Sequence, residues 1–164
     1  MSAPPIIRPY RATDRAATAL VYYRAIHEGT TTHYNAAQRA AWAPRATPDS
    51  AKPDKLLDQW AWVADEGGKI TGFMSLCPDG LLDMAFVLPE AMGTGLATAL
   101  YTALLTRARA ARLPRLTVEA SPYSYGFLRK HGWQVDWQGE RIYDGMLFYG
   151  YHMSLALDQT PPAV

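Results

Sequence analysis

The most constraining feature of this sequence is an apolar segment followed at once by two glycines and a helical pattern. Leu81–Val87 predicts a strand, Glu90–Gly95 an irregular glycine-containing turn, and Leu96–Ala111 a helix with apolar residues at helical spacing. A second short apolar strand, Leu116–Ala120, follows that helix. A strand–helix–strand crossover of this kind places its two strands side by side and parallel. The sequence therefore predicts one parallel pair of strands.

The glycine loop, Met92–Ala97, has the chemistry of an anion-binding site. The first N–H groups of a helix have no partner inside the helix, and the helix dipole adds partial positive charge there. Gly93 and Gly95 allow a backbone with positive φ and a close approach of a ligand. These properties together favour a phosphate or a diphosphate.

Two common phosphate-binding motifs do not fit the glycine loop. A Walker loop needs Gly-Lys-Ser/Thr at the start of the helix, but here Gly95 is followed by Leu96 and Ala97. A dinucleotide fingerprint needs a third glycine, and Thr98 occupies that position. The ligand is therefore predicted to be neither a nucleoside triphosphate nor a nicotinamide or flavin dinucleotide.

The rest of the chain alternates helical and strand patterns. Asp14 is predicted to cap the first helix. Pro122 stands at the first position of the last predicted helix, where proline is favoured. Further strands are predicted at Ile6–Pro9, Trp60–Ala64, Ile70–Leu76, Trp133–Trp137 and Met146–Leu157, helices at Arg15–Gly29, Asn35–Trp42 and Pro122–Lys130, a helical turn at Pro53–Gln59, and a loop around Gly139–Gly145. This order predicts an α+β fold, an α/β sandwich with a mixed, mostly antiparallel sheet of about six to seven strands flanked by helices.

Composition and charge exclude several functional classes. The chain has 164 residues, 49% hydrophobic and 19% charged, which predicts one domain over residues 1–164 with flexible ends at 1–5 and 158–164. Its net charge of +1 gives no field for holding nucleic acid or an anionic membrane. The single Cys77 and four scattered histidines predict no disulfide and no metal site. No segment approaches the roughly 18 apolar residues of a membrane span, so we expect a cytoplasmic protein.

The stretch from the strand into the helix resembles the acyl-CoA signature of the GNAT N-acetyltransferase superfamily. That signature is Gln/Arg-x-x-Gly-x-Gly/Ala, and here Glu90 stands at its first position, before Gly93 and Gly95. Downstream, Leu116–Ser121 and Gly126–Trp133 are similar to the family's strand and the helix that ends in Phe-Tyr-x-x-x-Gly-Phe. The resemblance covers nearly the whole chain and implies the acyl-CoA N-acyltransferase type of fold.

The resemblance also implies acetyl-CoA as co-substrate and a place for it. Pantetheine is expected between the strands Leu81–Val87 and Leu116–Ala120, pairing with main-chain groups at Phe86 and Val87. Phe127 and Lys130 are expected to contact the cofactor. The N–H groups expected to hold its diphosphate are those of Met92, Gly93, Thr94, Gly95, Leu96 and Ala97.

The family's reaction is direct attack of an amine on the thioester, which requires a proton acceptor and benefits from a proton donor for the thiolate. Glu119 and Asp83 each lie on a strand beside the expected cleft, and the sequence does not decide between them. The family's usual tyrosine falls on Leu128, so Tyr123 and Tyr125 are the phenols that could replace it.

These features predict an N-acetyltransferase that acts on a primary amine of a small molecule. Two alternatives remain open at this point. The missing tyrosine at Leu128 is compatible with a non-catalytic module that only binds CoA, and the acceptor could instead be a protein N-terminus or a lysine. A homodimer formed through the last strands is also possible.

Overall fold

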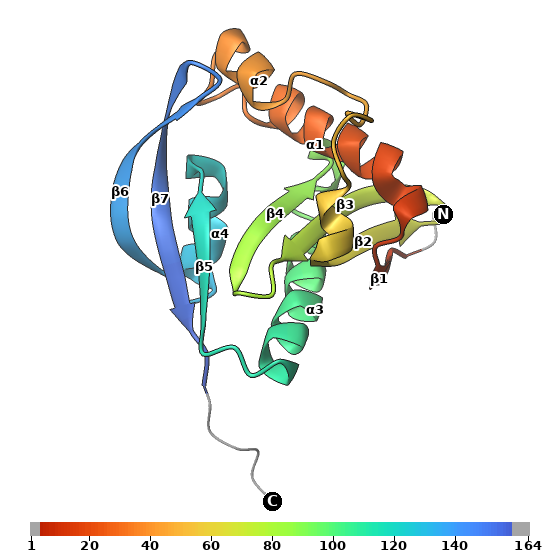
Figure 1. The fold of residues 1–164 in the computed structure, drawn as a ribbon, viewed down its shortest axis with the longest axis vertical. Coiled ribbons are helices and arrows are strands. Elements are labelled where there is room, and N and C mark those ends of the chain that lie inside the picture. The colour runs from red at the N-terminus through yellow and green to blue at the C-terminus, as the bar shows by residue number, and fades with distance from the viewer. Residues whose placement is uncertain (1–3, 159–164) are drawn as a thin grey trace, which may run out of the picture.

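The computed structural model describes residues 4–158 (Figure 1). The predicted flexible ends, 1–5 and 158–164, therefore lie outside the described residues except for positions 4, 5 and 158.

One mixed sheet of seven strands organises the fold, in the order β1-β2-β3-β4-β5-β7-β6. All neighbouring pairs are antiparallel except β4 and β5, which are parallel as predicted. The strands are β1 (Ile6–Pro9), β2 (Trp60–Glu66), β3 (Lys69–Leu76), β4 (Leu81–Val87), β5 (Arg115–Ala120), β6 (Gln134–Tyr143) and β7 (Met146–Ala156). The predicted α+β fold class is confirmed.

Four α-helices cover the two faces of the sheet: α1 (Arg15–Gly29), α2 (Ala36–Trp42), α3 (Leu96–Ala110) and α4 (Pro122–Lys130). Helix α1 packs on β3 and β4, and α3 packs on β2 and β3 from the other side (Figure 1). A ring contact between Tyr101 of α3 and Phe127 of α4, with centroids 5.6 Å apart, joins these two helices. No helix within residues 4–158 is long and apolar enough to cross a membrane.

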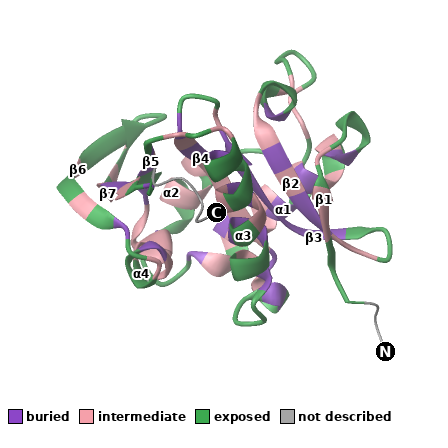
Figure 2. Cartoon of the chain, turned by 90° about the horizontal axis from the view of Figure 1, so that it is seen from below, coloured by how far each residue is buried: buried purple, intermediate pink, exposed green. Residues whose placement is uncertain are grey.

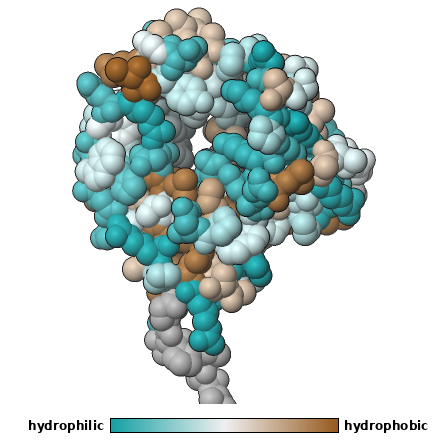
Figure 3. Space-filling view, in the orientation of Figure 1, coloured by the Kyte–Doolittle hydropathy of each residue, from teal (hydrophilic) through white to brown (hydrophobic). Residues whose placement is uncertain are grey.

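Strands β4 and β5 diverge soon after they meet. They pair only at Leu81↔Thr117 and Leu82↔Val118. The register between β3 and β4 also shifts here, since Ser75 pairs with Met84 and Leu76 with Leu82, which leaves Asp83 as the extra residue of a β-bulge. In the space-filling view an opening lies between β4 and β5, below α2 (Figure 3).

The divergence explains the burial of β4. The strand is apolar except at Asp83, yet only Leu82 is buried and the other six positions are half-buried. A strand buried in a sheet needs neighbours on both sides, and β4 loses β5 after two residue pairs. Its free edge is therefore available to a ligand.

Buried side chains of α3, β2 and β3 belong to the core, whereas β6 is exposed along most of its length (Figure 2). Trp133 and Tyr101 are the largest buried side chains of the core, at 1% and 2% exposure. The Trp133 Nε1–H donates to the Tyr101 hydroxyl at 2.7 Å. This bond satisfies the only polar atom of a buried indole.

The predicted loop around Gly139–Gly145 is wrong. Strand β6 continues to Tyr143, and the chain reverses in the two residues Asp144 and Gly145, whose φ angles are +48° and +75°. A two-residue Asp-Gly turn with two positive φ angles matches the twist of a hairpin. Strands β6 and β7 consequently form a long ribbon at the edge of the sheet.

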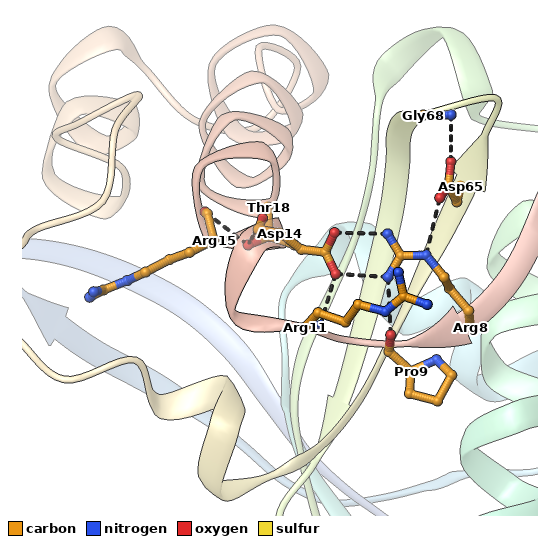
Figure 4. A network of polar contacts seen from close by, with 8 residues as sticks. All are labelled: Arg8, Pro9, Arg11, Asp14, Arg15, Thr18, Asp65 and Gly68. Atoms are coloured by element: carbon orange, nitrogen blue, oxygen red, sulfur yellow. Dashed lines mark hydrogen bonds and ion pairs between the residues drawn. The ribbon is translucent and has the colours of Figure 1, made fainter.

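Asp14 stands directly before α1, but its side chain makes no capping bond to that helix. It instead accepts two bonds from Arg8 of β1, at 2.8 and 2.9 Å, while the Arg8 Nε–H donates to Asp65 of β2 at 3.1 Å (Figure 4). Arg8 lowers the pKa of Asp14, and the Gly68 N–H followed by Arg8 lowers the pKa of Asp65. The network ties β1, β2 and the start of α1 together.

Candidate active site

The glycine loop presents a group of N–H donors at the start of α3. Gly95 is the residue before the helix, with φ +87° and ψ 1°, and Gly93 has φ +75°. The N–H of Met92 donates to Pro89 and that of Thr94 to Ala91, so both are used inside the loop. Among the described residues, no acceptor faces the N–H groups of the other four positions of the loop: Gly93, Gly95, Leu96 and Ala97.

Gly93 and Gly95 are needed for the positive φ angles of the loop and not for close packing. A Cβ built on Gly93 or Gly95 would have nothing within 4 Å. Both positions are also exposed. Free donors, an open approach and the positive end of a 15-residue helix make this loop suitable for an anion.

Glu90, which departs from the family signature, is neutralised by basic side chains. Its carboxylate accepts from both terminal nitrogens of Arg24 in α1, at 2.8 and 2.9 Å, and Lys69 lies 3.7 Å away. Arg24 lowers the pKa of Glu90 to about 2. The acidic residue beside the loop therefore carries no unpaired charge, and it connects the loop to α1.

The register of β4 determines which main-chain groups face the gap. The Leu88 N–H donates to the Thr71 carbonyl opposite it, at 2.8 Å. Because bonded and non-bonded pairs alternate along antiparallel strands, Phe86 points its main-chain groups toward β3 and Val87 points its own toward the gap. The Phe86 ring instead contacts Tyr22 of α1, with centroids 4.8 Å apart.

Two α4 residues, Phe127 and Lys130, were expected at the cofactor. Phe127 packs on Tyr101, and Lys130 is exposed and has no ion pair within the described residues. Leu128, at the position of the usual tyrosine, is buried at 3% exposure and has no access to the gap.

The two candidate phenols differ in their hydrogen bonds. The Tyr123 hydroxyl donates to the Thr30 carbonyl at 2.7 Å and accepts from the His33 N–H at 2.6 Å, so its proton is already bound in a structural contact. Tyr125 stacks near Tyr151, with centroids 4.5 Å apart, and its hydroxyl has no hydrogen-bond partner in residues 4–158. Tyr125 is therefore the phenol with a free proton.

The two candidate carboxylates also differ. Asp83 lies at the bulge of β4, where Lys55 and Gln59, at 2.9 Å each, hold it against the turn η2 (Lys55–Asp58). Glu119 of β5 instead lines a cavity and contacts His152 and Arg141.

Glu119 forms a three-residue cluster that the sequence did not indicate. Its Oε1 lies 2.6 Å from Nδ1 of His152, and its Oε2 lies 2.8 Å from Nη2 of Arg141. The His152 ring stacks on Trp137, with centroids 5.2 Å apart and planes 3° from parallel. His152 and Arg141 come from β7 and β6, so only the pairing of strands distant in sequence brings them to Glu119.

A cavity of about 410 Å³ opens beside this cluster. Six of its lining residues are aromatic and come from α2, β6, β7 and the segment before α2. Its lining residues are Tyr34, Trp42, Glu119, Ala120, Ser121, Trp137, Gly139, Glu140, Arg141, Tyr143, Phe148, Tyr149 and Gly150. Another cavity, of about 380 Å³, lies beside the glycine loop and is lined in part by Lys69, Thr71 and Gly95.

The single cysteine is poorly suited to a covalent step. Burial raises the pKa of the Cys77 thiol, and the neighbouring Asp83 and Asp79 raise it further. A thiol held in its protonated form is a weak nucleophile. Within residues 4–158, no group of three or more His, Cys, Asp or Glu side chains is arranged to hold a metal ion.

Comparisons with known proteins agree with this geometry. A family model described as an acetyltransferase (GNAT) domain matches residues 28–155. A crystal structure from Rhodopseudomonas palustris, described as a GCN5-related N-acetyltransferase: aminotransferase, class-II, has 32% identity and a TM-score of 0.86, covering 96% of this chain and 98% of that one. No curated protein matches the chain.

Two more distant structures show the same fold. The PaiA N-acetyltransferase from Thermoplasma acidophilum, in complex with coenzyme A, has 13% identity and a TM-score of 0.79, covering 94% of this chain and 100% of that one. The yncA protein from Salmonella typhimurium, with its cofactor acetyl-CoA, has 21% identity and a TM-score of 0.66, covering 99% of each chain.

Proposed function

The chain belongs to the GNAT acetyltransferase family, and we propose that it transfers an acetyl group from acetyl-CoA to a primary amine of a small molecule. The observation that carries the proposal is the set of free N–H donors in the glycine loop, next to the opening between β4 and β5. Relatives with this fold have been solved with coenzyme A and with acetyl-CoA.

Acetyl-CoA would lie with its diphosphate on the N–H groups of Gly93, Gly95, Leu96 and Ala97. Its pantetheine arm would pair with the main chain of Val87 at the free edge of β4. Phe127 and Lys130 of α4 would flank this path, and Lys130, which is exposed, would offer an unpaired cation to a phosphate. The glycine loop and the diverging strands would thus bring the thioester to the centre of the sheet.

The reaction would proceed by direct attack. The amine nitrogen forms a bond to the thioester carbon, the C–S bond breaks, the electron pair leaves on the CoA sulfur, and the nitrogen loses its second proton to solvent as the amide forms. The ammonium must first give up a proton, and the Glu119–His152 pair is the acceptor that we propose. With a proton on Nδ1 facing the carboxylate, His152 keeps a lone pair on Nε2, which has no partner among the described residues.

Tyr125 is the proposed proton donor to the departing thiolate, because its hydroxyl is the one that no other group in residues 4–158 holds. Tyr123 is assigned instead to holding α4 against the segment between α1 and α2, through Thr30 and His33. A phenol from Tyr125 would replace the family tyrosine whose position is the buried Leu128.

The cavity supports a small acceptor over a protein chain. Its volume of about 410 Å³ lies within the range of small-molecule sites, roughly 300–1,000 Å³. The absent tyrosine at Leu128 favours the other alternative, a module that binds CoA without turnover. Cytoplasmic location and a homodimer through the last strands stay predictions.

The test is release of free CoA thiol from acetyl-CoA in the presence of a panel of primary amines. Release that depends on the amine, with an acetylated product of the expected mass, supports the proposal. Glu119→Gln should lower kcat by about a hundredfold or more. Asp83→Asn should leave kcat within about twofold of the original, because Asp83 is held at η2. CoA binding without turnover of any amine would assign the chain to the non-catalytic class.

A further inference from the structure

The acceptor cavity is built on one face of the β6–β7 ribbon, the face turned toward α2. Side chains on this face come in rows, because directly paired residues of antiparallel strands point the same way. Three successive rows, two residues apart, are Trp137 with His152, Gly139 with Gly150, and Arg141 with Phe148.

The middle row has no side chains of its own, and its Gly150 position is covered by the Ala120 carbonyl oxygen, which lies 2.8 Å from where a Gly150 Cβ would stand. The rows on either side lie about 7 Å away, at two residues of a strand each. The Trp137 ring covers the Gly139 position, since its ring carbons lie 3.2 and 3.5 Å from where a Gly139 Cβ would stand. The indole thus forms one wall of the cavity.

The opposite wall is aromatic and mutually packed. The Phe148 ring lies 5.2 Å from that of Tyr34, 6.1 Å from Trp42 and 6.4 Å from Tyr143, all in edge-to-face contact. Rings held in this way by one another form a preorganised surface for another aromatic group.

The charges of the cavity suit one ammonium group. Among its lining residues only Glu119, Glu140 and Arg141 are charged. Glu140 alternates with Arg141 along β6, so its side chain lies on the opposite face of the ribbon. Glu119 is therefore the one carboxylate that this face offers to an ammonium, and because it also pairs with Arg141 at 2.8 Å, nothing in the lining balances the further charges of a polyamine.

We propose that the acceptor is a primary monoamine attached to an aromatic body, with its ring between the side chains of Trp137 and Phe148 and its nitrogen toward Glu119. This inference rests on the proposed acetyl transfer and names the acceptor class for the same site. An arylalkylamine such as 2-phenylethylamine has this chemistry.

Binding is tested first, without turnover. The full chain saturated with CoA is titrated with 2-phenylethylamine, and with spermidine and ethylamine as comparisons, while tryptophan emission is followed. Trp137 and Trp42 line the cavity, so 2-phenylethylamine should change the emission saturably, and Trp137→Phe should reduce that change. A response to spermidine but none to 2-phenylethylamine would overturn the assignment.

Kinetic variants then test the position of the ring. Gly139→Val pushes the Trp137 ring, which would lie 3.2 Å from the new Cβ, into the cavity and should raise KM for 2-phenylethylamine at least about tenfold. Phe148→Leu should raise it roughly 2- to 12-fold by removing ring contacts. Both should leave KM for acetyl-CoA within about twofold. The matched control is Ile142→Ala, on the other face of β6 at 73% exposure, which should change neither constant.

The outcomes separate the two proposals. Acetylation of spermidine or a peptide, with 2-phenylethylamine neither bound nor used, would overturn the acceptor class and leave acetyl transfer standing. Saturable binding of 2-phenylethylamine with no acetylation of any amine would support the cavity assignment while contradicting the enzyme. An unchanged KM for 2-phenylethylamine in both Gly139→Val and Phe148→Leu would place the ring elsewhere.

Discussion

Gly95→Ala is the substitution that most sharply separates the ligand-binding role of the glycine loop from its structural role. Gly95 has φ +87°, and a left-handed backbone costs a residue with a Cβ roughly 1–2 kcal/mol. An added Cβ would meet no atom within 4 Å, so no packing clash contributes. The expected loss of stability is therefore only about 1–2 kcal/mol.

The expected loss of affinity is larger. If the peptide at Gly95 turns to relieve the strain, one N–H leaves the diphosphate, and a hydrogen bond to a charged group contributes roughly 1.5–3 kcal/mol. That free energy corresponds to a Kd for CoA that is roughly 10- to 150-fold weaker. Isothermal titration of CoA measures the affinity, and urea unfolding measures the stability.

The matched control is Gly67→Ala in the turn between β2 and β3. Gly67 also has a positive φ, +62°, and open space around its Cβ position. The Gly67→Ala variant should lose a similar amount of stability, while its Kd for CoA stays within about twofold of that of the original chain. The reasoning is refuted if Gly95→Ala binds CoA as tightly as the original chain, or if Gly67→Ala weakens CoA equally.

Three further substitutions test other contacts. Asp14→Asn should destabilise the fold by about 2 kcal/mol at pH 7, since Asp14 bonds to Arg8 through charge. Because Arg8 lowers the pKa of Asp14 below its ordinary value of 3.8, this stability is complete above pH 4 and is lost as the pH falls further, so urea unfolding at pH 7 and pH 3 should differ less in the variant. Gly150→Ala should cost roughly 1–3 kcal/mol in the same assay, because its Cβ would lie 2.8 Å from the Ala120 carbonyl oxygen. Tyr125→Phe should lower kcat for acetyl transfer without changing the unfolding midpoint, and an unchanged kcat would remove the phenol from the reaction.

Local sequence signals predicted most of the fold. The boundaries of β4 and α4 and the start of α3 agree with the structure because each has a local marker: an apolar run stopped by Pro89, Pro122 at a first helical position, and Gly95 before a helix. Proline and glycine favour the ends of helices and strands through their own backbone conformation. This preference acts within a few positions and needs no distant partner.

Features that depend on distant contacts were missed. The sequence predicted that β6 ends too early, because Gly139 favours a loop locally. In the structure Gly139 lies inside the strand, where it pairs with Gly150 of β7. The contact of Glu119 with His152 and Arg141 depends on the order β5-β7-β6, and the bulge at Asp83 depends on its pairing with β3. The sequence could therefore propose Glu119 and Asp83 but could not rank them.

The central claim is that free N–H groups of the glycine loop bind the diphosphate of CoA. The most direct measurement is the amide N–H NMR spectrum of the full chain, titrated with CoA and, separately, with pantetheine, which lacks the diphosphate. We expect CoA to shift the signals of Gly93, Gly95, Leu96 and Ala97 the most, and pantetheine to leave those four unchanged. Saturation with CoA while those four signals stay in place would contradict the claim.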